Sequence, residues 1–346
     1  MSDGGAVRVW APGRVNLIGE HTDYMGGLVL PMAVDLGITI EGRRGGDRIT
    51  LTSDAEAQPV DIALPIGDPA LVEAAWGRFV AAMAAELGVT EGLVGTVTST
   101  VPKGSGLSSS TALTVATALA LGDDGPPADT ARRCLSAEIA ATGVPGGIMD
   151  QMVIAAGVEG HALLLDCRSM EVEPVRVPPD AGVVVLHSGQ HRRLAESAYA
   201  ERRAQCEAAE AIIGPLREAT VADVDAISDP LLRRRARHVV SENGRVLAFA
   251  AALRDDDLVA AGALMLEGHR SLRDDFEVST DVLDGLVQTL ATTPGVHGAR
   301  LTGAGFGGCV VALTEPGLLL EGPAGVWPVR AVEGARHLTA GGPTSG

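Results

Sequence analysis

The sequence predicts an α+β protein with two lobes, and three features of the chain indicate this. Short apolar segments with strand-like alternation dominate the first part, whereas the segments that follow residue 190 are long and have helical spacing. Two strand-like segments then return close to the end of the sequence. At about 150 residues per domain, the length of 346 residues suggests a first domain over 1–170 and a second over 171–340, followed by a disordered tail at 341–346.

The first half of the chain is expected to form strands and then helices. Its apolar, alternating stretches are bounded by Gly, Pro and Asp, which favour turns. The expected strands are 7–10, 15–18, 28–33, 37–43, 49–52, 60–64 and 94–101. Segments with apolar residues at helical spacing accompany them, and the expected helices are 70–87, 108–121 and 128–141.

The second half is expected to be mainly helical. Strands are predicted at 162–166 and 183–187, with the proline-bearing stretch 174–179 as a seam between them. The predicted helices are 192–213, 230–254, 258–272 and 280–292, and the returning strands are 300–302 and 309–313.

The charge balance excludes two classes of partner. The chain carries 27 Lys and Arg against 44 Asp and Glu, a formal net charge of −17. Nucleic acids and anionic membrane surfaces attract basic proteins, so we expect neither as a partner.

The four cysteines make no CxxC pair, no basic and apolar leader opens the chain, and no apolar run reaches the ~18 residues of a spanning helix. These features predict a cytoplasmic protein.

The segment 102–110, Pro-Lys-Gly-Ser-Gly-Leu-Ser-Ser-Ser, lies between a predicted strand and a predicted helix. Glycines allow backbone N–H groups to turn inward around an anion, and the start of the helix adds partial positive charge. Serine hydroxyls add donors or a metal ligand. The segment therefore favours a phosphate site, although a Gly-Ser turn with a capping serine gives the same spacing. It is not the P-loop pattern, because the only lysine of the chain precedes the glycines.

Two further segments carry carboxylates in positions that suit a small polar substrate. Residues 20–23, Glu-His-Thr-Asp, form a polar loop between apolar strands, and two carboxylates three residues apart suit the hydroxyls of a sugar. A solvated turn gives the same pattern. Asp150 follows a double-Gly turn, and Arg14, if it lies beside Asp150, would hold that carboxylate as a proton acceptor. A helix-capping Asp is the alternative.

The glycine-rich segment 303–308 does not have the context of a dinucleotide site. A dinucleotide-binding GxGxxG follows a strand and opens a helix, whereas these glycines lead into the apolar strand expected at 309–313. A loop packed beside a nucleotide pocket fits this context better.

Taken together, these motifs resemble those of the galactokinases, within the GHMP superfamily of small-molecule kinases. GRVNLIGEHTDY at 13–24 is similar to the family's sugar signature, GSGLSSS at 104–110 to its phosphate motif, and LTGAGFGGCVV at 301–311 to its third motif. GIMDQ, SAYAERRAQCE, RARHVVSEN and SLRDDFEVS match further segments in the family's order. The resemblance implies the two-lobed GHMP kinase fold, with an N-terminal mixed sheet with helices and a sandwich-like C-terminal α/β lobe.

The resemblance also implies a reaction and the residues that perform it. The reaction is transfer of the γ-phosphoryl group of ATP to the anomeric (C1) hydroxyl of galactose, with Mg²⁺ as the metal. Asp150 matches the catalytic proton acceptor, and Arg14 matches the arginine that orients it. The positions that match sugar-binding residues are Glu20, His21, Thr22, Asp23, Gly147 and Tyr199. Those that match ATP-binding residues are Ser53, Trp76, Gly104, Ser105, Gly106, Leu107, Ser108, Ser109 and Ser110, and those that match metal ligands are Ser110 and Glu138.

Departures from the family pattern leave alternatives open. Met25 stands where Asn or Asp is common, near the expected sugar pocket, while Thr111 replaces an Ala and Gly268 replaces a Ser. A GHMP kinase for a related sugar (arabinose, galacturonate or N-acetylgalactosamine) is the first alternative, and a non-catalytic galactose and ATP sensor is the second. The expected partners are ATP and a monosaccharide, with galactose favoured. The oligomeric state is open, with a monomer favoured.

Overall fold

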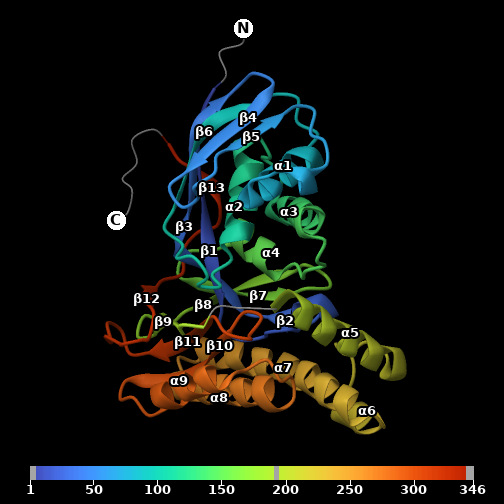
Figure 1. Cartoon of the computed structure of the whole chain (residues 1–346). Helices are drawn as coiled ribbons and strands as arrows, with labels where there is room; N and C mark the ends of the chain where they lie inside the picture. Colours follow the sequence, from blue (N-terminus) through green and yellow to red (C-terminus); the bar gives the residue numbers. More distant parts are fainter. Residues whose placement is uncertain (1–4, 191–194, 340–346) are drawn as a thin grey trace.

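The computed structural model describes residues 5–190 and 195–339, and the tail expected at 341–346 lies outside them. Figure 1 shows most elements of the first part of the sequence, coloured blue to green, above most of those of the second part, coloured yellow to red, while β13 returns to the upper part. Helices and sheets occur in both lobes. The predicted α+β fold class is therefore confirmed.

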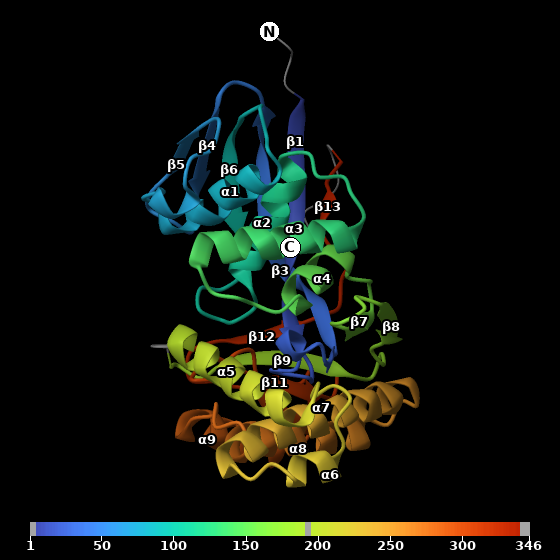
Figure 2. The same cartoon turned by 90° about the vertical axis from the view of Figure 1, so that its right-hand side faces the viewer.

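The upper lobe is built on a six-stranded sheet with the order β13-β1-β3-β6-β4-β5. Its two long strands, β1 (Ala6–Asn16) and β3 (Pro31–Arg44), pair antiparallel and run down toward the lower lobe (Figure 1). The shorter strands are β4 (Arg48–Ser53), β5 (Val60–Ala63), β6 (Leu93–Ser99) and β13 (Arg336–His337). The helices are α1 (Ala75–Glu86), α2 (Ser109–Ala120), α3 (Pro127–Thr142) and α4 (Met149–Ala156), which lie in front of the sheet in Figure 2.

The sequences of α2 and α3 explain how these helices are placed. α2 consists only of small or apolar residues, and ten of its twelve residues are buried, so it packs closely on β1 and β3. α3 begins at Pro127, which lacks the N–H group that a first helical turn leaves unpaired. It ends before Gly143, whose φ of 72° is easily adopted only by glycine.

The lower lobe contains a second sheet with helices packed against it, and a third sheet lies between the lobes in Figure 1. The second sheet is antiparallel, in the order β10-β11-β9-β12, with β9 (Gly182–His187), β10 (Val296–Thr302), β11 (Cys309–Thr314) and β12 (Val326–Val329). The third sheet contains β2 (Leu28–Val29), β7 (His161–Asp166) and β8 (Val172–Arg176). The helices are α5 (Ala195–Ile213), α6 (Val221–Asp225), α7 (Pro230–Arg254), α8 (Leu258–Asp274) and α9 (Asp281–Ala291), and short 3-10 turns occupy Asp23–Met25 and Pro69–Leu71.

Most expected elements are present, but the structure corrects several of them. β1 is continuous where two strands were expected around Pro12 and Gly13, because a bulge at this step absorbs the shift in register. Pro174 lies inside β8 rather than in a seam, since an edge strand tolerates proline. α4, α6, β12 and β13 were not expected, and β13 brings the chain back to the first sheet by pairing with β1. The domain boundary near residue 170 stays a prediction.

Three features are absent from the described part of the chain. None of its helices is long and apolar enough to cross a membrane. All four cysteines lie within residues 5–190 and 195–339, and no two of them form a disulfide. In the same ranges, no group of three His, Cys, Asp or Glu is arranged to hold a metal ion.

The backbones of helix α8 and strand β10 are in close contact at two glycines, Gly262 and Gly298. A Cβ atom at Gly262 would be 1.9 Å from the carbonyl oxygen of His297, and one at Gly298 would be 2.2 Å from the Gly262 oxygen. Neither position has room for a side chain. Because β10 leads into the loop that starts at residue 303, this contact fixes where that loop begins.

We expect Gly262→Ala to lower the free energy of unfolding by about 2 kcal/mol, because the added methyl group forces helix and strand apart. Gly285→Ala is the matched control, since Gly285 is also inside a helix and no atom lies within 4 Å of the place its Cβ would take. There the higher helix propensity of alanine is expected to raise the free energy of unfolding by up to ~1 kcal/mol. Urea denaturation measures both values, and equal effects would contradict the tight contact.

Candidate active site

A cavity of about 650 Å³ is lined by residues of both lobes. The end of β1, the loop before α2, the start of α4 and the loop after β10 all contribute to its wall. The residues expected from the sequence that line it are Arg14, Glu20, His21, Asp23, Gly104, Gly106, Ser108, Ser109, Ser110, Glu138, Gly147, Asp150 and Tyr199. Segments far apart in the sequence therefore meet at one site.

Arg14 and Asp150 form a two-point ion pair in this wall. The Nε and Nη2 groups of Arg14 donate to different oxygens of Asp150, each at 2.6 Å, and Nη1 donates to the carbonyl oxygen of Gly106 at 2.6 Å. The hydroxyl of Ser108 donates to the same carboxylate. Parallel, charge-assisted hydrogen bonds of this kind fix the plane of a carboxylate. Asp150 is thus held in one orientation beside the cavity.

The loop before α2 is shaped by residues with positive φ. Gly104 and Gly106 have φ values of 73° and 71°, and Ser108 has a φ of 56°. Ser108 immediately precedes α2 but makes no capping hydrogen bond with it, since its hydroxyl binds Asp150. The first N–H groups of α2 therefore remain available to an anion in the cavity, which the helix dipole also favours.

Glu138 lines the cavity from α3 and has one oxygen suited to a ligand. Its Oε2 accepts from the Thr111 hydroxyl at 3.2 Å, whereas Oε1 is buried and makes no hydrogen bond of standard geometry to the described residues. Burial, and then repulsion from Asp150, raise the pKa of Glu138 to about 8. A cation near Glu138 and the Ser110 hydroxyl would satisfy this oxygen and favour the ionised carboxylate.

Another part of the wall combines aromatic rings with a carboxylate. The rings of His21 and Tyr199 lie 5.7 Å apart, and that of Tyr24 lies 5.2 Å from Tyr199. Burial lowers the pKa of His21 to about 3, so its ring is neutral near pH 7. Burial, and then the neighbouring Asp150, raise the pKa of Asp23 to about 6. Asp23 and Tyr199, which both line the cavity, offer the acceptors and the donor that a ligand rich in hydroxyls requires.

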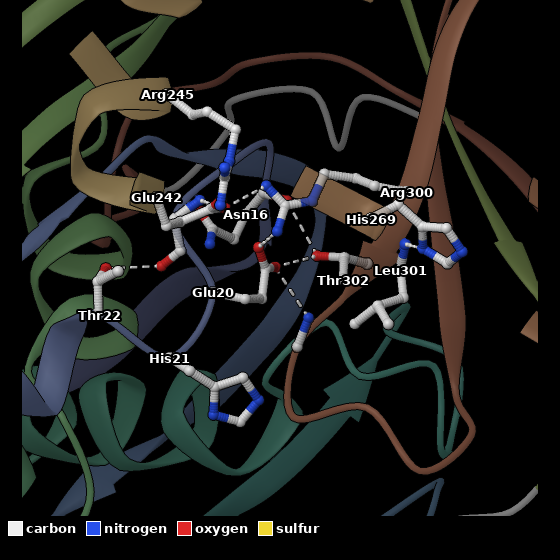
Figure 3. Close-up of polar contacts among 12 residues, drawn as sticks. Asn16, Glu20, His21, Thr22, Glu242, Arg245, His269, Arg300, Leu301 and Thr302 are labelled. Carbon is white, nitrogen blue, oxygen red and sulfur yellow. Dashed lines mark hydrogen bonds and ion pairs between the residues drawn. The ribbon is translucent and has the colours of Figure 1, made fainter. Parts of the chain in front are cut away.

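Two contacts fix the positions of these groups. A Cβ atom at Gly147 would be 1.8 Å from Oδ2 of Asp23, so a side chain there would displace the carboxylate. His21 Nε2 lies 3.2 Å from the carbonyl oxygen of Ala304, in the loop after β10. Figure 3 shows Glu20, also in the loop after β1, joined to the side chains of Arg300 and Thr302. The lower lobe thus closes the cavity against the loop that follows β1.

A smaller pocket of about 150 Å³ adjoins the cavity and shares Ser109 and Ser110 with it. Ser53 and Trp76, the residues expected near a nucleotide base, both line this pocket, and Leu113 adds an aliphatic wall. The indole N–H of Trp76 donates to the carbonyl oxygen of Gln58 at 2.9 Å, which orients its ring. A pocket with aromatic and aliphatic walls suits a flat base.

Comparison with known proteins agrees with this geometry. Sequence models of the galactokinase galactose-binding signature, the GHMP kinase N-terminal domain and the GHMP kinase C-terminal region match residues 3–44, 71–158 and 249–318. Human galactokinase is 45% identical over 329 residues, which cover 89% of this chain and 83% of that protein. The chain belongs to the galactokinase family. The galactokinase of Roseiflexus sp. (strain RS-1) is 42% identical over 332 residues, with the same two coverages of 89% and 83%.

Solved structures place this galactokinase-family chain in the GHMP kinase fold. The crystal structure of Lactococcus lactis galactokinase complexed with galactose superposes with a TM-score of 0.88 at 31% identity, covering 96% of this chain and 95% of that one. Methanococcus jannaschii mevalonate kinase shares the fold, with a TM-score of 0.69 at 19% identity over 96% of this chain and 99% of that one. The predicted two-lobed GHMP kinase fold is therefore confirmed.

Some residues that galactokinase motifs led us to expect in the site lie behind its wall. The Thr22 hydroxyl is within hydrogen-bond distance of the carbonyl oxygens of Gly19 (2.9 Å) and Leu28 (2.7 Å), so it closes its own loop. Ser105 and Leu107 are buried in the loop before α2. Met25 does not line the cavity, since its side chain is buried in an apolar cluster that also contains Val184 and Leu186, and its closeness to the sugar pocket stays a prediction.

Three residues that support the site were given no role from the sequence, although one of them, Glu242, lies within the matched segment RARHVVSEN. Thr111 was noted only as a departure, yet it binds Glu138. Arg300 and Glu242 form a buried ion pair with each other at 2.9 Å. A signal for Arg300 was present, since it opens the strand predicted at 300–302 and stands between the apolar residues Ala299 and Leu301, and a charge that becomes buried needs a partner.

Asp23 makes the stability of the folded protein depend on pH. Its pKa rises from the ordinary value of 3.8 to about 6 on folding, so ionisation of Asp23 above pH 6 opposes folding and protonation relieves that opposition. We expect Asp23→Asn to raise the free energy of unfolding by about 1–3 kcal/mol at pH 8, and by much less at pH 4. Urea unfolding at both pH values measures the gain. Equal gains at the two pH values would refute the shift.

Proposed function

We propose that the protein transfers the γ-phosphoryl group of ATP to the anomeric hydroxyl of galactose. The observation that supports this most strongly is that the Arg14–Asp150 pair and the serine-rich loop before α2 line one cavity. A carboxylate fixed by an arginine supplies a proton acceptor, and the loop with the start of α2 supplies an anion site beside it. Both requirements of phosphoryl transfer to a hydroxyl are thus present together.

We assign the sugar to the part of the cavity that Asp150 and the loop after β1 enclose. Glu20, Asp23 and the Tyr199 hydroxyl would bind sugar hydroxyls directly. The neutral His21 ring would form the wall beside them, since its nitrogens lie 3.0 Å from the Tyr24 hydroxyl and 3.2 Å from the Ala304 carbonyl oxygen. The match of residues 3–44 to a galactose-binding signature supports this assignment. The galactose in the Lactococcus lactis structure supports the choice of sugar.

In the proposed reaction, the C1 oxygen of galactose bonds to the γ-phosphorus as the bond to the β-phosphate oxygen breaks and ADP leaves. Asp150 accepts the proton of the C1 hydroxyl, which is more acidic than that of an ordinary alcohol. Arg14 keeps Asp150 in place, and its charge stabilises the negative charge of the transferring phosphoryl group. Positioning and charge stabilisation supply most of the catalysis in such transfers.

We place the triphosphate of ATP along residues 104–110 and its base in the smaller pocket, beside Ser53 and Trp76. Mg²⁺ would be held by the Ser110 hydroxyl and by Oε1 of Glu138, which are oxygen ligands of the kind that this ion prefers. The buried oxygen of Glu138 supports the fit. When bound, the ion neutralises charge on the phosphates.

A panel of sugars with ATP and Mg²⁺, followed by release of ADP, tests the reaction. Galactose is expected to have the highest kcat/KM. A tenfold preference, about 1.4 kcal/mol, for arabinose, galacturonate or N-acetylgalactosamine would favour a kinase for a related sugar. Binding of galactose and ATP without turnover would favour a sensor.

Asp150→Asn is expected to lower kcat by about 10²- to 10⁴-fold, because the amide does not accept the proton, while the affinity for ATP stays within about twofold. Asp123→Asn is the matched control. Asp123 also forms a two-point pair with an arginine, Arg133, but does not line the cavity. Undiminished turnover in Asp150→Asn, with ATP binding retained, would remove Asp150 from the mechanism.

Ser110→Ala is expected to raise the Mg²⁺ concentration for half-maximal activity by about 10-fold, because one of two protein ligands is lost. Ser136→Ala serves as the control, since the Ser136 hydroxyl binds Glu86 on another part of the upper lobe. A magnesium titration of Ser110→Ala that overlays that of the control would argue against the ligand role.

A further inference from the structure

Arg300 is a fully buried arginine that lies between two buried glutamates (Figure 3). It extends from β10, where its Nη2 is 2.5 Å from Oε2 of Glu20 and its Nη1 is 2.9 Å from Oε1 of Glu242. A buried cation is stable only with such partners, and each buried carboxylate depends equally on the cation. The three side chains therefore take one arrangement or lose stability together.

Glu20 is oriented by the lower lobe rather than by its own loop. Its Oε1 accepts from the Thr302 hydroxyl at 3.1 Å and from the Gly303 N–H at 3.0 Å, while Oε2 faces Arg300. Burial raises the pKa of Glu20, and the charge of Arg300 opposes that rise. Each carboxylate oxygen has more than one acceptor direction. Glu20 is among the residues that line the cavity, which places its side chain beside the ligand that the proposed function assigns there.

Glu242 ties the same arginine to α7 and to the loop after β1. Its Oε1 accepts from the Gly19 N–H at 3.0 Å, and its Oε2 pairs with Arg245 at 2.6 Å. Burial acts to raise the pKa of Glu242, but Arg300 and Arg245 outweigh it and hold the pKa at about 2. Glu242 is therefore a permanent anion, and it keeps the guanidinium of Arg300 beside the loop.

Two neighbours of Glu242 on α7 bind the backbone of the same loop. His238 Nε2 lies 3.0 Å from the carbonyl oxygen of Glu20, and the Leu28 N–H donates to Oδ1 of Asn243 at 2.7 Å. The loop is thus held at its start, at Glu20 and at its end by one helix of the lower lobe. Arg300 extends these contacts to the side chain of Glu20, which is among the residues that line the cavity.

We infer that Arg300 is a positioning residue for the sugar: by joining Glu242 to Glu20, it sets the direction in which the Glu20 carboxylate meets a sugar hydroxyl. The inference rests on the proposed function, in which Glu20 accepts that hydroxyl bond. Selectivity between hexoses that differ at one hydroxyl then depends on Arg300, although Arg300 touches no substrate.

Arg300→Lys tests this with the charge retained. A lysine offers one ammonium group in place of the guanidinium fork, so it does not hold both glutamates in the same geometry. We expect KM for galactose, and Kd for galactose measured by calorimetry, to rise by about 10-fold, with KM for ATP within about twofold. Arg235→Lys is the control, because Arg235 is also buried but pairs with Glu277. An equal rise in both variants would show general loosening of the lobe and overturn the inference.

A double-mutant cycle separates positioning from mere stability. If Arg300 acts through Glu20, then Arg300→Lys adds less than about twofold to KM for galactose once Glu20→Gln is present. Independent effects that multiply would overturn the inference. If Arg300→Lys does not fold, Glu242→Gln replaces it in the cycle, because the amide keeps the shape and an acceptor for the Gly19 N–H. It is expected to raise KM for galactose by about threefold.

The outcomes distinguish the inference from the proposed function. If the unaltered protein does not phosphorylate galactose, or if Glu20→Gln leaves KM for galactose unchanged, the proposed function or its assignment of Glu20 fails. If both hold and Arg300→Lys leaves KM and Kd for galactose unchanged, the inference alone is overturned.

Discussion

The ion pair between Arg14 and Asp150 fixes three segments that are far apart in the sequence. Arg14 belongs to β1, Gly106 to the loop before α2, and Asp150 to α4. A guanidinium donates in fixed directions within one plane, so it sets the relative orientation of its partners as well as their distance. The backbone adds to this, since the Arg14 N–H donates to the Leu107 carbonyl oxygen at 3.0 Å. The wall of the cavity follows from this one contact.

The charge of the cavity explains how its ligands and its stability are connected. Among the described residues that line it are four carboxylates and one arginine: Glu20, Asp23, Glu138, Asp150 and Arg14. Burial and mutual repulsion raise the pKa values of Asp23 and Glu138. Ionisation of these two carboxyl groups therefore lowers the stability of the folded protein when no ligand is bound. Under the proposed function, sugar hydroxyls and a divalent cation would relieve this loss of stability. A triphosphate, which is itself anionic, enters such a cavity favourably only together with a cation.

Local patterns predicted much of the fold because the long helices and inner strands have strong apolar periodicity. The helix that carries Asp150 was missed, since α4 is short and begins directly after a Gly-Gly turn that suggested a loop. Motif residues such as Arg14 were found from the sequence, because their spacing along the chain carries the signal. Arg300 and Glu242 were not given a role, since 58 positions separate them and the packing of β10 on α8, and of α8 on α7, is what brings them together.

The return of the chain to β1 completes the edge of the first sheet only after residue 336 has been synthesised. β13 pairs with Val9 and Trp10, and the Leu338 N–H donates to the Arg8 carbonyl oxygen at 2.8 Å. The first sheet therefore leaves the ribosome with one strand edge open, and that edge waits until almost the whole lower lobe has been translated. An open edge is a template for other chains. A nascent polypeptide that stalls before residue 336 leaves the β1 edge unpaired. Late ribosome arrest therefore raises the risk that the first sheet pairs with other chains and aggregates.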